Sequence, residues 1–592
     1  MAMWAVLSLC FLSTCMADIV LEERGYLKLP DRNNNFAVNS GAAKESAYDR
    51  TDRFLYVVGT ESAVLHIVDV FDVDNPSVVQ TFNFDVALEG FPLDIQVCRG
   101  LPNRAYFAVS FGVNDPTRQG HVILYNPYRR GDTTLNPINP GDPLLSVGSN
   151  PDNIKFTSDC AKLVVSNEGV PAVINNEFID PPGTVSIISI PETGNPSIST
   201  VDFQSYDDPA ETSRLLALGV RYMVRVNPTT NSQNPFSNNI EPDYIAISPN
   251  NGYAYITLQE NNAIARIDLE QNALVSTYPM GYKEYLYSTL DASDQDQFPG
   301  VHMSRRNVRG LYQPDKITFM EWGGTLYLIT ADEGRPYNVP SLGISDNDRA
   351  RTLESDFGVD SALLAELLDN AQLGRAYIST MDRESLNDPI REVYTFGGRG
   401  FSVFNANTLI REWESGDVIE KVSRWFYPDV FNAGYTGPNL TPTGERDSRS
   451  PYMGPELNSV ATTTYQGRQL MIFGSGTNGQ IYVFQLQASV TQRVDPEFES
   501  VHRRGATDAT WANLYSREEM GDIGISDLVV IEEADSPIGG SPILIALSQQ
   551  SGSVSIYSFK DEQYPADGCV APTSLRSVGS GMNHHNRTRP AL

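Results

Sequence analysis

The sequence predicts an all-β chain, folded as a seven-bladed β-propeller with long loop insertions. A hairpin pattern recurs seven times, a short apolar strand introduced by an acidic residue precedes most copies, and 592 residues are too many for one sandwich core. Each hairpin is a strand rich in β-branched and aromatic residues, a polar turn and an alternating strand. Since one hairpin cannot bury its apolar face alone, consecutive copies must stack, and radial closure protects their edges.

The repeated elements follow one another along the whole chain. The hairpins span residues 54–70, 105–127, 162–190, 255–270, 325–406, 469–487 and 542–560, with insertions inside the third and the fifth. The short leading strands begin at Phe91, Pro151, Pro242, Pro314, Pro455 and Ile525. Two β-sandwiches in tandem are the rival architecture, but they explain seven related hairpins less well.

Two further elements complete the predicted fold. The segment GYLKL at 25–29 supplies the missing strand of the last blade and closes the ring. The segment at 360–374 has apolar residues at helical spacing and a glycine stop, which predicts a helix. Because it lies within the insertion between Asp332 and Arg391, we expect it to decorate the propeller rather than form a domain. A single propeller domain would then span 18–560, followed by a flexible tail at 561–592.

The N-terminus predicts secretion. Residues 4–15 are apolar, and Cys15-Met16-Ala17 resembles a small-x-Ala cleavage site, so residues 1–17 are interpreted as a signal peptide. A membrane anchor is disfavoured because a span needs about 20 apolar residues. Sequons at Asn439 and Asn586 predict glycosylation.

Cysteine usage agrees with an oxidising compartment. Removal of the leader leaves only Cys98, Cys160 and Cys569, too few for a disulfide scaffold. Cys98 and Cys160 occupy equivalent points of neighbouring repeats, so we expect them to pair. Cys569 is then left for an intermolecular bond.

Composition excludes one class of partner. The formal net charge of −30 and pI near 4.5 argue against nucleic-acid binding. Hydrophobic content of 41% and aromatic content of 10% are sufficient for a folded core, so this is not an acidic disordered chain.

Acidic residues recur at fixed places in the repeats. Those near the leading strands are Asp94, Asp152, Asp243, Asp315, Glu456 and Asp527, and those in hairpin turns are Glu61, Glu168, Glu260, Asp332 and Glu333. If the leading strands line the central channel, these carboxylates crowd around one mouth and must be protonated, hydrogen-bonded or neutralised by a cation. Carboxylate and amide oxygens suit calcium or magnesium, and with only six histidines zinc or copper is disfavoured. The set therefore predicts calcium; the alternative for each residue is that it caps a turn.

A second acidic spot lies at 290–297, where Asp291, Asp294 and Asp296 resemble a loop that wraps a cation. They do not match the EF-hand pattern, and a merely solvated loop is the alternative. The chain has no G-x-S-x-G, P-loop or H-E-x-x-H motif, so no catalytic residue is predicted.

Several segments resemble the mesenchyme-specific cell-surface glycoprotein family. They include AAKESAYDRTDRFLYVVGTESAVLHIVDV, YAYITLQENNAIARIDLE, LYQPDKITFMEWGGTLYLITADEG and GGRGFSVFNA, and the resemblance covers about 42–560. It implies a secreted or lipid-anchored propeller of the choice-of-anchor type, glycosylated and linked to calcium, associated with calcium carbonate skeletons and shells. The C-terminal segment lacks the hydrophobic tail of a lipid anchor, which favours a released shell or skeletal matrix protein.

Three functions remain open from the sequence. The first is a non-enzymatic, calcium-binding protein of the extracellular matrix, whose partners would be calcium ions or calcium carbonate mineral and other matrix proteins. The second is a calcium-dependent, phytase-like phosphoesterase, with Arg335 as a candidate phosphate ligand. The third is a protein-binding scaffold that uses the insertions at 335–391 and 425–452. The chain lacks Asp-rich low-complexity runs, which argues against direct mineral templating.

Overall fold

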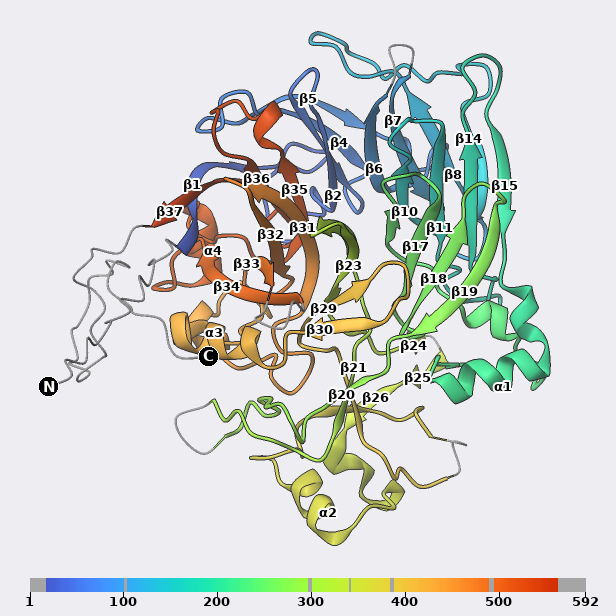
Figure 1. The fold of residues 1–592 in the computed structure, drawn as a ribbon, viewed down its shortest axis with the longest axis vertical. Coiled ribbons are helices and arrows are strands. Elements are labelled where there is room, and N and C mark those ends of the chain that lie inside the picture. Colours follow the sequence, from blue (N-terminus) through green and yellow to red (C-terminus); the bar gives the residue numbers. More distant parts are fainter. Residues whose placement is uncertain are drawn as a thin grey trace, which may run out of the picture.

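The computed structural model describes residues 18–100, 104–296, 301–339, 342–383, 388–488 and 494–562 (Figure 1). The predicted signal peptide, Cys569, Asn586 and nearly all of the predicted tail lie outside these ranges.

Seven four-stranded antiparallel sheets make up the main body, and the all-β prediction is confirmed. The first sheet contains β2 (Glu45–Asp49), β3 (Phe54–Gly59), β4 (Val64–Asp69) and β5 (Ser77–Asn83). The second contains β6 (Phe91–Arg99), β7 (Ala105–Gly112), β8 (Gln119–Tyr125) and β9 (Leu145–Ser149). The third contains β10 (Pro151–Phe156), β11 (Lys162–Asn167), β14 (Thr184–Ser189) and β15 (Ser197–Val201). The fourth contains β16 (Ile245–Ile247), β17 (Tyr253–Leu258), β18 (Ala263–Asp268) and β19 (Ala273–Pro279).

The remaining three sheets follow the same order of strands. The fifth contains β22 (Ile317–Trp322), β23 (Thr325–Asp332), β29 (Gly400–Asn405) and β30 (Arg411–Glu414). The sixth contains β31 (Leu457–Tyr465), β32 (Arg468–Ser475), β33 (Gln480–Ala488) and β34 (Val494–Arg503). The seventh contains β35 (Ile525–Ile531), β36 (Ile543–Ser548), β37 (Ser553–Glu562) and, as its outer strand, β1 (Asp18–Lys28). All seven hairpins predicted from the sequence are paired strands.

The leading strands of the sheets contact one another in a cycle. β2 contacts β6, β6 contacts β10, and the series continues through β16, β22, β31 and β35, which contacts β2 again. β1 pairs antiparallel with β37, from Asp18 opposite Glu562 to Lys28 opposite Ser553. The N-terminal strand therefore completes the last sheet as predicted, although it is longer than residues 25–29.

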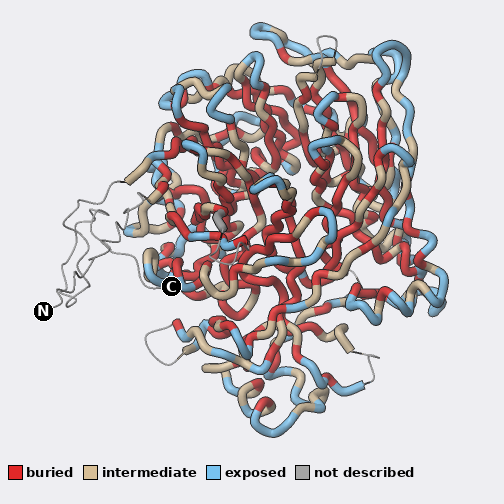
Figure 2. Tube along the Cα trace, viewed as in Figure 1, coloured by how far each residue is buried: buried red, intermediate tan, exposed pale blue. Residues whose placement is uncertain are grey.

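The hydrophobic core lies between neighbouring sheets, where the tube in Figure 2 is almost continuously buried. Tyr56 of the first sheet packs against Phe107 of the second, with ring centroids 5.0 Å apart. Phe401 of the fifth sheet stacks on Phe473 of the sixth at 4.0 Å. Alternating side chains of each strand thus fill the spaces on either side of its sheet.

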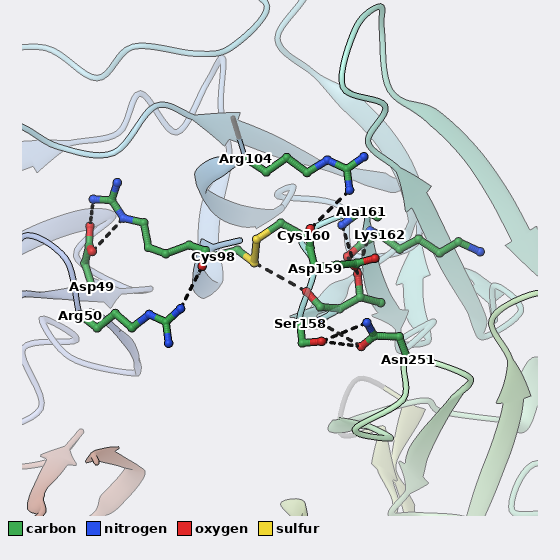
Figure 3. The surroundings of a disulfide bond; sticks show 12 residues. Asp49, Arg50, Cys98, Arg104, Ser158, Asp159, Cys160, Ala161, Lys162 and Asn251 are labelled. Carbon is green, nitrogen blue, oxygen red and sulfur yellow. Dashed lines mark hydrogen bonds and ion pairs between the residues drawn. A yellow bond between two sulfur atoms is a disulfide. The ribbon is translucent and has the colours of Figure 1, made fainter. Parts of the chain in front are cut away.

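Cys98, in β6, and Cys160, in the turn between β10 and β11, form a disulfide with an S–S distance of 1.98 Å (Figure 3). The pairing predicted from the sequence is present, and it links the second sheet to the third.

A smaller unit projects from the main body at the bottom of Figure 1. Its sheet contains β20 (Tyr282–Glu284), β21 (Arg309–Leu311), β28 (Tyr394–Phe396), β27 (Tyr377–Ser379) and β26 (Asn347–Arg349), accompanied by α2 (Ser361–Leu368). Leu363 and Leu367 of α2 pack with Tyr285, Leu290 and Val308 in a core of their own.

Two expectations about this segment need correction. The helix is shorter than 360–374: Asp360 caps its N-terminus, and turns follow Leu368. The insertion also does more than decorate the main body, because it combines with residues 282–311 into a sheet and a separate core.

The other helices are α1 (Pro209–Leu218), α3 (Val418–Phe426) and α4 (Trp511–Ser516). Two small hairpins are β12 (Ala172–Ile174) with β13 (Glu177–Ile179) and β24 (Asn338–Val339) with β25 (Ile344–Ser345).

Candidate metal centre

A cavity of about 430 Å³ lies where several hairpin turns meet, and we call it the mouth cavity. Its polar lining includes Glu168, Glu241, Glu260, Glu333, Arg335, Tyr337 and Tyr452. Three of the glutamates follow the second strand of a sheet: Glu168 follows β11, Glu260 follows β17, and Glu333 follows β23. Because the sheets repeat the same meander, these turns come to the same end of the molecule.

The turn at 259–262 shows how amides position a carboxylate. The side-chain amide of Asn261 donates to the carbonyl oxygens of Arg221 and Asn239, and its oxygen accepts from the backbone N–H of Glu241 at 3.1 Å. The Asn262 amide in turn donates to a backbone carbonyl and accepts a backbone N–H. These bonds fix the turn and leave the carboxylate of Glu260 to line the mouth cavity.

Three carboxylates converge in this cavity. One oxygen from each of Glu168, Glu241 and Glu260 lies within 4.8 Å of the other two. Glu168 and Glu260 belong to the repeated pattern, whereas Glu241 was not predicted. Its position directly before the Pro-Asp pair that introduces β16 is the sequence signal that could have identified it.

Burial and the repulsion of neighbouring carboxylates disfavour ionisation of two of these acids, Glu168 and Glu241. The pKa of Glu168 is raised to about 7 by burial and by Asp152. The pKa of Glu241 is raised well above its usual value by burial and then by Glu260 and Glu168. The residue is only 4% exposed, and its carboxylate has no hydrogen bond or ion pair with any residue that the structure describes. Such a group is stabilised by a proton or by a cation.

More predicted acids surround this group. Burial and the neighbouring Asp315 raise the pKa of Asp243, and burial and Glu333 raise that of Asp315. Burial also raises the pKa of Glu333 to about 7, with Glu456 as the next cause.

Several basic side chains offset part of this negative charge, among them Lys316, which acts on Asp315. Lys44 Nζ lies 3.0 Å from Asp152, Arg335 Nε lies 2.9 Å from Glu260, and Arg449 Nε donates to Glu456 at 2.6 Å. The acids described so far outnumber these cations. Carboxylate oxygens without basic partners are the donor set that calcium and magnesium prefer, so the residues present fit a hard divalent cation.

Other predicted acids have structural partners elsewhere. Asp94 accepts hydrogen bonds from the backbone N–H of Ile154 and from the side-chain amide of Asn153, both in β10 of the third sheet. Asp332 is buried and accepts from the hydroxyls of Thr330 and Ser402. These two do not join the mouth cavity, because hydrogen-bond donors within the sheets hold their carboxylates.

Asp527 also lies apart from the mouth cavity. Together with Glu45 it holds Lys316 Nζ, each at 2.8 Å, in a second cavity of about 470 Å³ lined by the leading strands. Glu61 is exposed in its turn.

Only two of the three predicted acids of the loop at 290–297 lie close to each other. Asp291 and Asp296 approach Asp447, an acid that was not predicted, with one oxygen from each within 4.8 Å of the others. Asp294 instead forms a bidentate pair with Arg375, at 2.7 and 2.8 Å. The sequon residue Asn439 is exposed in a loop.

No helix among the described residues is long and apolar enough to cross a membrane.

Comparison with known proteins gives relatives for much of the chain. The chain is 32% identical over 352 residues to the mesenchyme-specific cell surface glycoprotein of Strongylocentrotus purpuratus, a match that covers 55% of this chain and 44% of that protein. It is 28% identical over 198 residues to Gigasin-3a of Magallana gigas, which covers 33% of this chain and 68% of that protein. The match therefore spans less than half the length of the first relative.

The structure is distantly similar to solved WD40 and β-propeller structures. The WD40 domain of Toxoplasma gondii coronin gives a TM-score of 0.40 at 8% identity, covering 93% of this chain and 88% of that chain. The β-propeller domain of Cps50 from Myceliophteria thermophila gives 0.36 at 8% identity, covering 92% of this chain and 99% of that chain. At these scores the likeness adds nothing to the description of the fold.

The family model of the choice-of-anchor I domain matches residues 44–489, which is most of the chain. The matched range runs from the first sheet into the sixth and includes every residue of the mouth cavity named above. The chain therefore belongs to the choice-of-anchor I domain family.

Proposed function

We propose that this protein is a secreted, acidic, calcium-binding glycoprotein of the extracellular matrix, with a role in calcium carbonate biomineralisation. The observation that carries the proposal is the group of buried carboxylates at the mouth cavity, which exceeds its basic partners. Kinship with a protein named as a cell surface glycoprotein supports an extracellular location. Extracellular calcium modules bind at about 10⁻⁴–10⁻³ M, which suffices where calcium is abundant.

The proposed architecture is a seven-bladed β-propeller, with each four-stranded sheet as one blade. The cycle of contacts among leading strands and the pairing of β1 with β37 support a closed ring. A closed ring would hold the turns of several blades rigidly around one mouth, which favours a preformed ion site over a flexible acidic surface.

Calorimetric titration of calcium into the chelator-stripped mature protein tests the proposal. We expect saturable binding in the wild type and a marked loss in the variant Asp243→Asn/Asp315→Asn. A control with the same change of charge is Glu192→Gln/Glu270→Gln, two exposed acids away from the mouth cavity, and it should bind like the wild type. Weak uptake that is equal in all three proteins would overturn the calcium proposal.

A calcium-dependent phosphoesterase is the second candidate, because one basic side chain shares the cavity with the carboxylates. The side chain of Arg335 is 55% exposed and its Nε pairs with Glu260, so part of this side chain is accessible from solvent beside the carboxylates. A bound cation and this guanidinium together could bind a phosphoryl group. Turnover of a generic phosphate ester that chelator abolishes would support this activity; absence of turnover with calcium bound would exclude it.

A further inference from the structure

We propose that Glu168, Glu241 and Glu260 are direct ligands of one calcium ion and that Arg335 competes with this ion for Glu260. The inference rests on the proposed calcium binding and names its ligands. It differs from the sequence-based set in that Glu241 becomes the central residue.

The spacing of the three carboxylates fits a shared ion. Calcium–oxygen distances are about 2.3–2.6 Å, so two oxygens bound to one ion lie no more than about 5 Å apart. The oxygens of Glu168, Glu241 and Glu260 meet this condition, since all lie within 4.8 Å of one another. The cavity beside them leaves room for the waters that would complete a calcium coordination sphere.

Glu241 is the observation that distinguishes this cluster from an ordinary acidic patch. The residue is 96% buried and lines the mouth cavity, and among the described residues its carboxylate has no hydrogen bond and no ion pair, although the charge of Arg335 acts on it at longer range. A turn-capping glutamate would accept backbone N–H groups, and a structural ion pair would have a basic partner. Since neither is present, a cation in the cavity is the group that satisfies an ionised Glu241.

The other two glutamates are held in place and still have oxygens to offer. Glu168 accepts one hydrogen bond, from Asn150 Nδ2 at 2.6 Å. Glu260 pairs with Arg335 through Oε1. Each carboxylate has several lone-pair positions, so both can bind an ion while keeping their present orientation.

The contacts of Arg335 would let its guanidinium move away from Glu260 while its backbone stays in place. Its backbone is fixed on both sides, because its N–H donates to Gln313 Oε1 at 3.2 Å and its carbonyl accepts from the Gln313 amide. Its side chain, in contrast, is more than half exposed and is held to Glu260 by the ion pair of its Nε. The guanidinium can therefore swing away when a divalent ion takes its place, with no change in the loop.

Terbium luminescence and calcium calorimetry on the full mature chain test this assignment. Tyr337 and Tyr452 line the same cavity, so terbium bound there should be sensitised by excitation of tyrosine. We expect Glu241→Gln to weaken calcium binding by about tenfold or more and to abolish the sensitised emission, because the variant removes one charged ligand. Glu168→Gln removes a second proposed ligand, and we expect it to weaken calcium binding as well.

Arg335→Gln should have the opposite effect and tighten calcium binding about threefold or more, because it removes the competing positive charge. The exposed variant Glu192→Gln serves as the control and should match the wild type. Thermal unfolding of each chelator-stripped variant establishes that it is folded.

The outcomes separate this inference from the proposed function. If the wild type takes up no calcium saturably, both proposals fail. If the wild type binds calcium and both Glu241→Gln and Glu168→Gln bind it equally well, the ion lies elsewhere and only this inference fails. Unchanged affinity in Arg335→Gln overturns the competition by arginine.

Discussion

Asp94 illustrates how a carboxylate can serve the fold rather than a ligand. It is fully buried in β6, and one of its oxygens accepts from the backbone N–H of Ile154 and from Asn153 Nδ2, both at 2.8 Å. These bonds join the leading strands of the second and third sheets. We expect Asp94→Ala to lower the free energy of unfolding by about 2–4 kcal/mol, because it leaves buried donors without acceptors.

Denaturant unfolding of Asp94→Ala, followed with and without calcium, checks this expectation. Calcium affinity should stay within about twofold of the wild type, because Asp94 lies outside the mouth cavity. An unchanged unfolding midpoint, or a loss of calcium binding without a loss of stability, would contradict the structural role.

A second residue, Asp180, makes stability depend on pH. Its side chain is buried, Oδ2 accepts from Asn234 Nδ2 at 2.5 Å, and Oδ1 has no partner among the described residues. Burial raises the pKa of Asp180 to about 7, whereas an unfolded aspartate loses its proton near pH 4. The folded state therefore binds more protons between these values, so this group's contribution to stability falls as pH rises from about 4 to about 7.

Replacement of Asp180 by Asn should remove that contribution. Thermal unfolding at pH 5 and pH 7.5 in chelator should show a smaller loss of stability between the two pH values than in the wild type. Asp202→Asn is a suitable control, because Asp202 is exposed and its carboxylate accepts from the backbone N–H of Gln204. Equal pH dependence in Asp180→Asn and the wild type would show that Asp180 is ionised throughout this range.

The repeat pattern predicted some of the acidic residues of the mouth cavity but not all of them. The repeat pattern identified Glu168 and Glu260, because a position in a repeated turn determines its place at the mouth. It could not separate them from Asp332, since the hydroxyls that bind Asp332 come from two different strands. Glu241 was missed because it lies just before the repeated Pro-Asp pair, at a position that is neither the leading-strand acid nor the acid of a hairpin turn.

Among the elements, the disulfide between β6 and the turn after β10 has the clearest energetic consequence. It closes a loop of 62 residues, for which chain entropy gives a stabilisation of about 4 kcal/mol. Both cysteines are buried. Because alanine is small and apolar, Cys98→Ala/Cys160→Ala removes the disulfide without burying a polar group. We expect this double variant to unfold at a lower temperature, with calcium binding retained because the mouth cavity is formed by other residues.

Reduction of the wild type provides the matching measurement. Unfolding of the wild type in reductant should approach that of the double variant, whereas reductant should leave the variant unchanged. Equal unfolding of oxidised and reduced wild type would show that the bond does not constrain the unfolded chain.

The hairpins were predictable as elements because each depends on contacts between residues close in sequence. The projecting unit was not, because its sheet includes a parallel pairing of β21 with β28, more than 80 residues apart. Short strands of three residues carry too little periodicity to reveal such a pairing. The leucines of the predicted helix were recognised, but their partners in residues 285–308 were not.

At the scale of the whole molecule, the sequence repeats correspond to the seven sheets, and the chain carries a formal net charge of −30. The acidic residues behind this charge fall into a buried group and an exposed group. Asp243 and Asp315 are each 8% exposed within the main body, whereas many other acids lie on the outer surface. Buried acids cannot contact a flat mineral face, so we expect adsorption to calcium carbonate and binding of dissolved calcium to depend on different residues.

Adsorption of Asp243→Asn/Asp315→Asn to calcium carbonate crystals tests this separation. The variant changes the formal net charge only from −30 to −28 (−30 + 2), so its adsorption should equal that of the wild type and weaken with salt, as expected for exposed charges. Its calorimetric calcium binding should nevertheless be markedly weakened, because the variant removes two buried negative charges close to the proposed ligands. If adsorption is lost together with calcium binding, the ion at the mouth takes part in contact with the mineral, and the acidic outer surface alone is not sufficient to bind it.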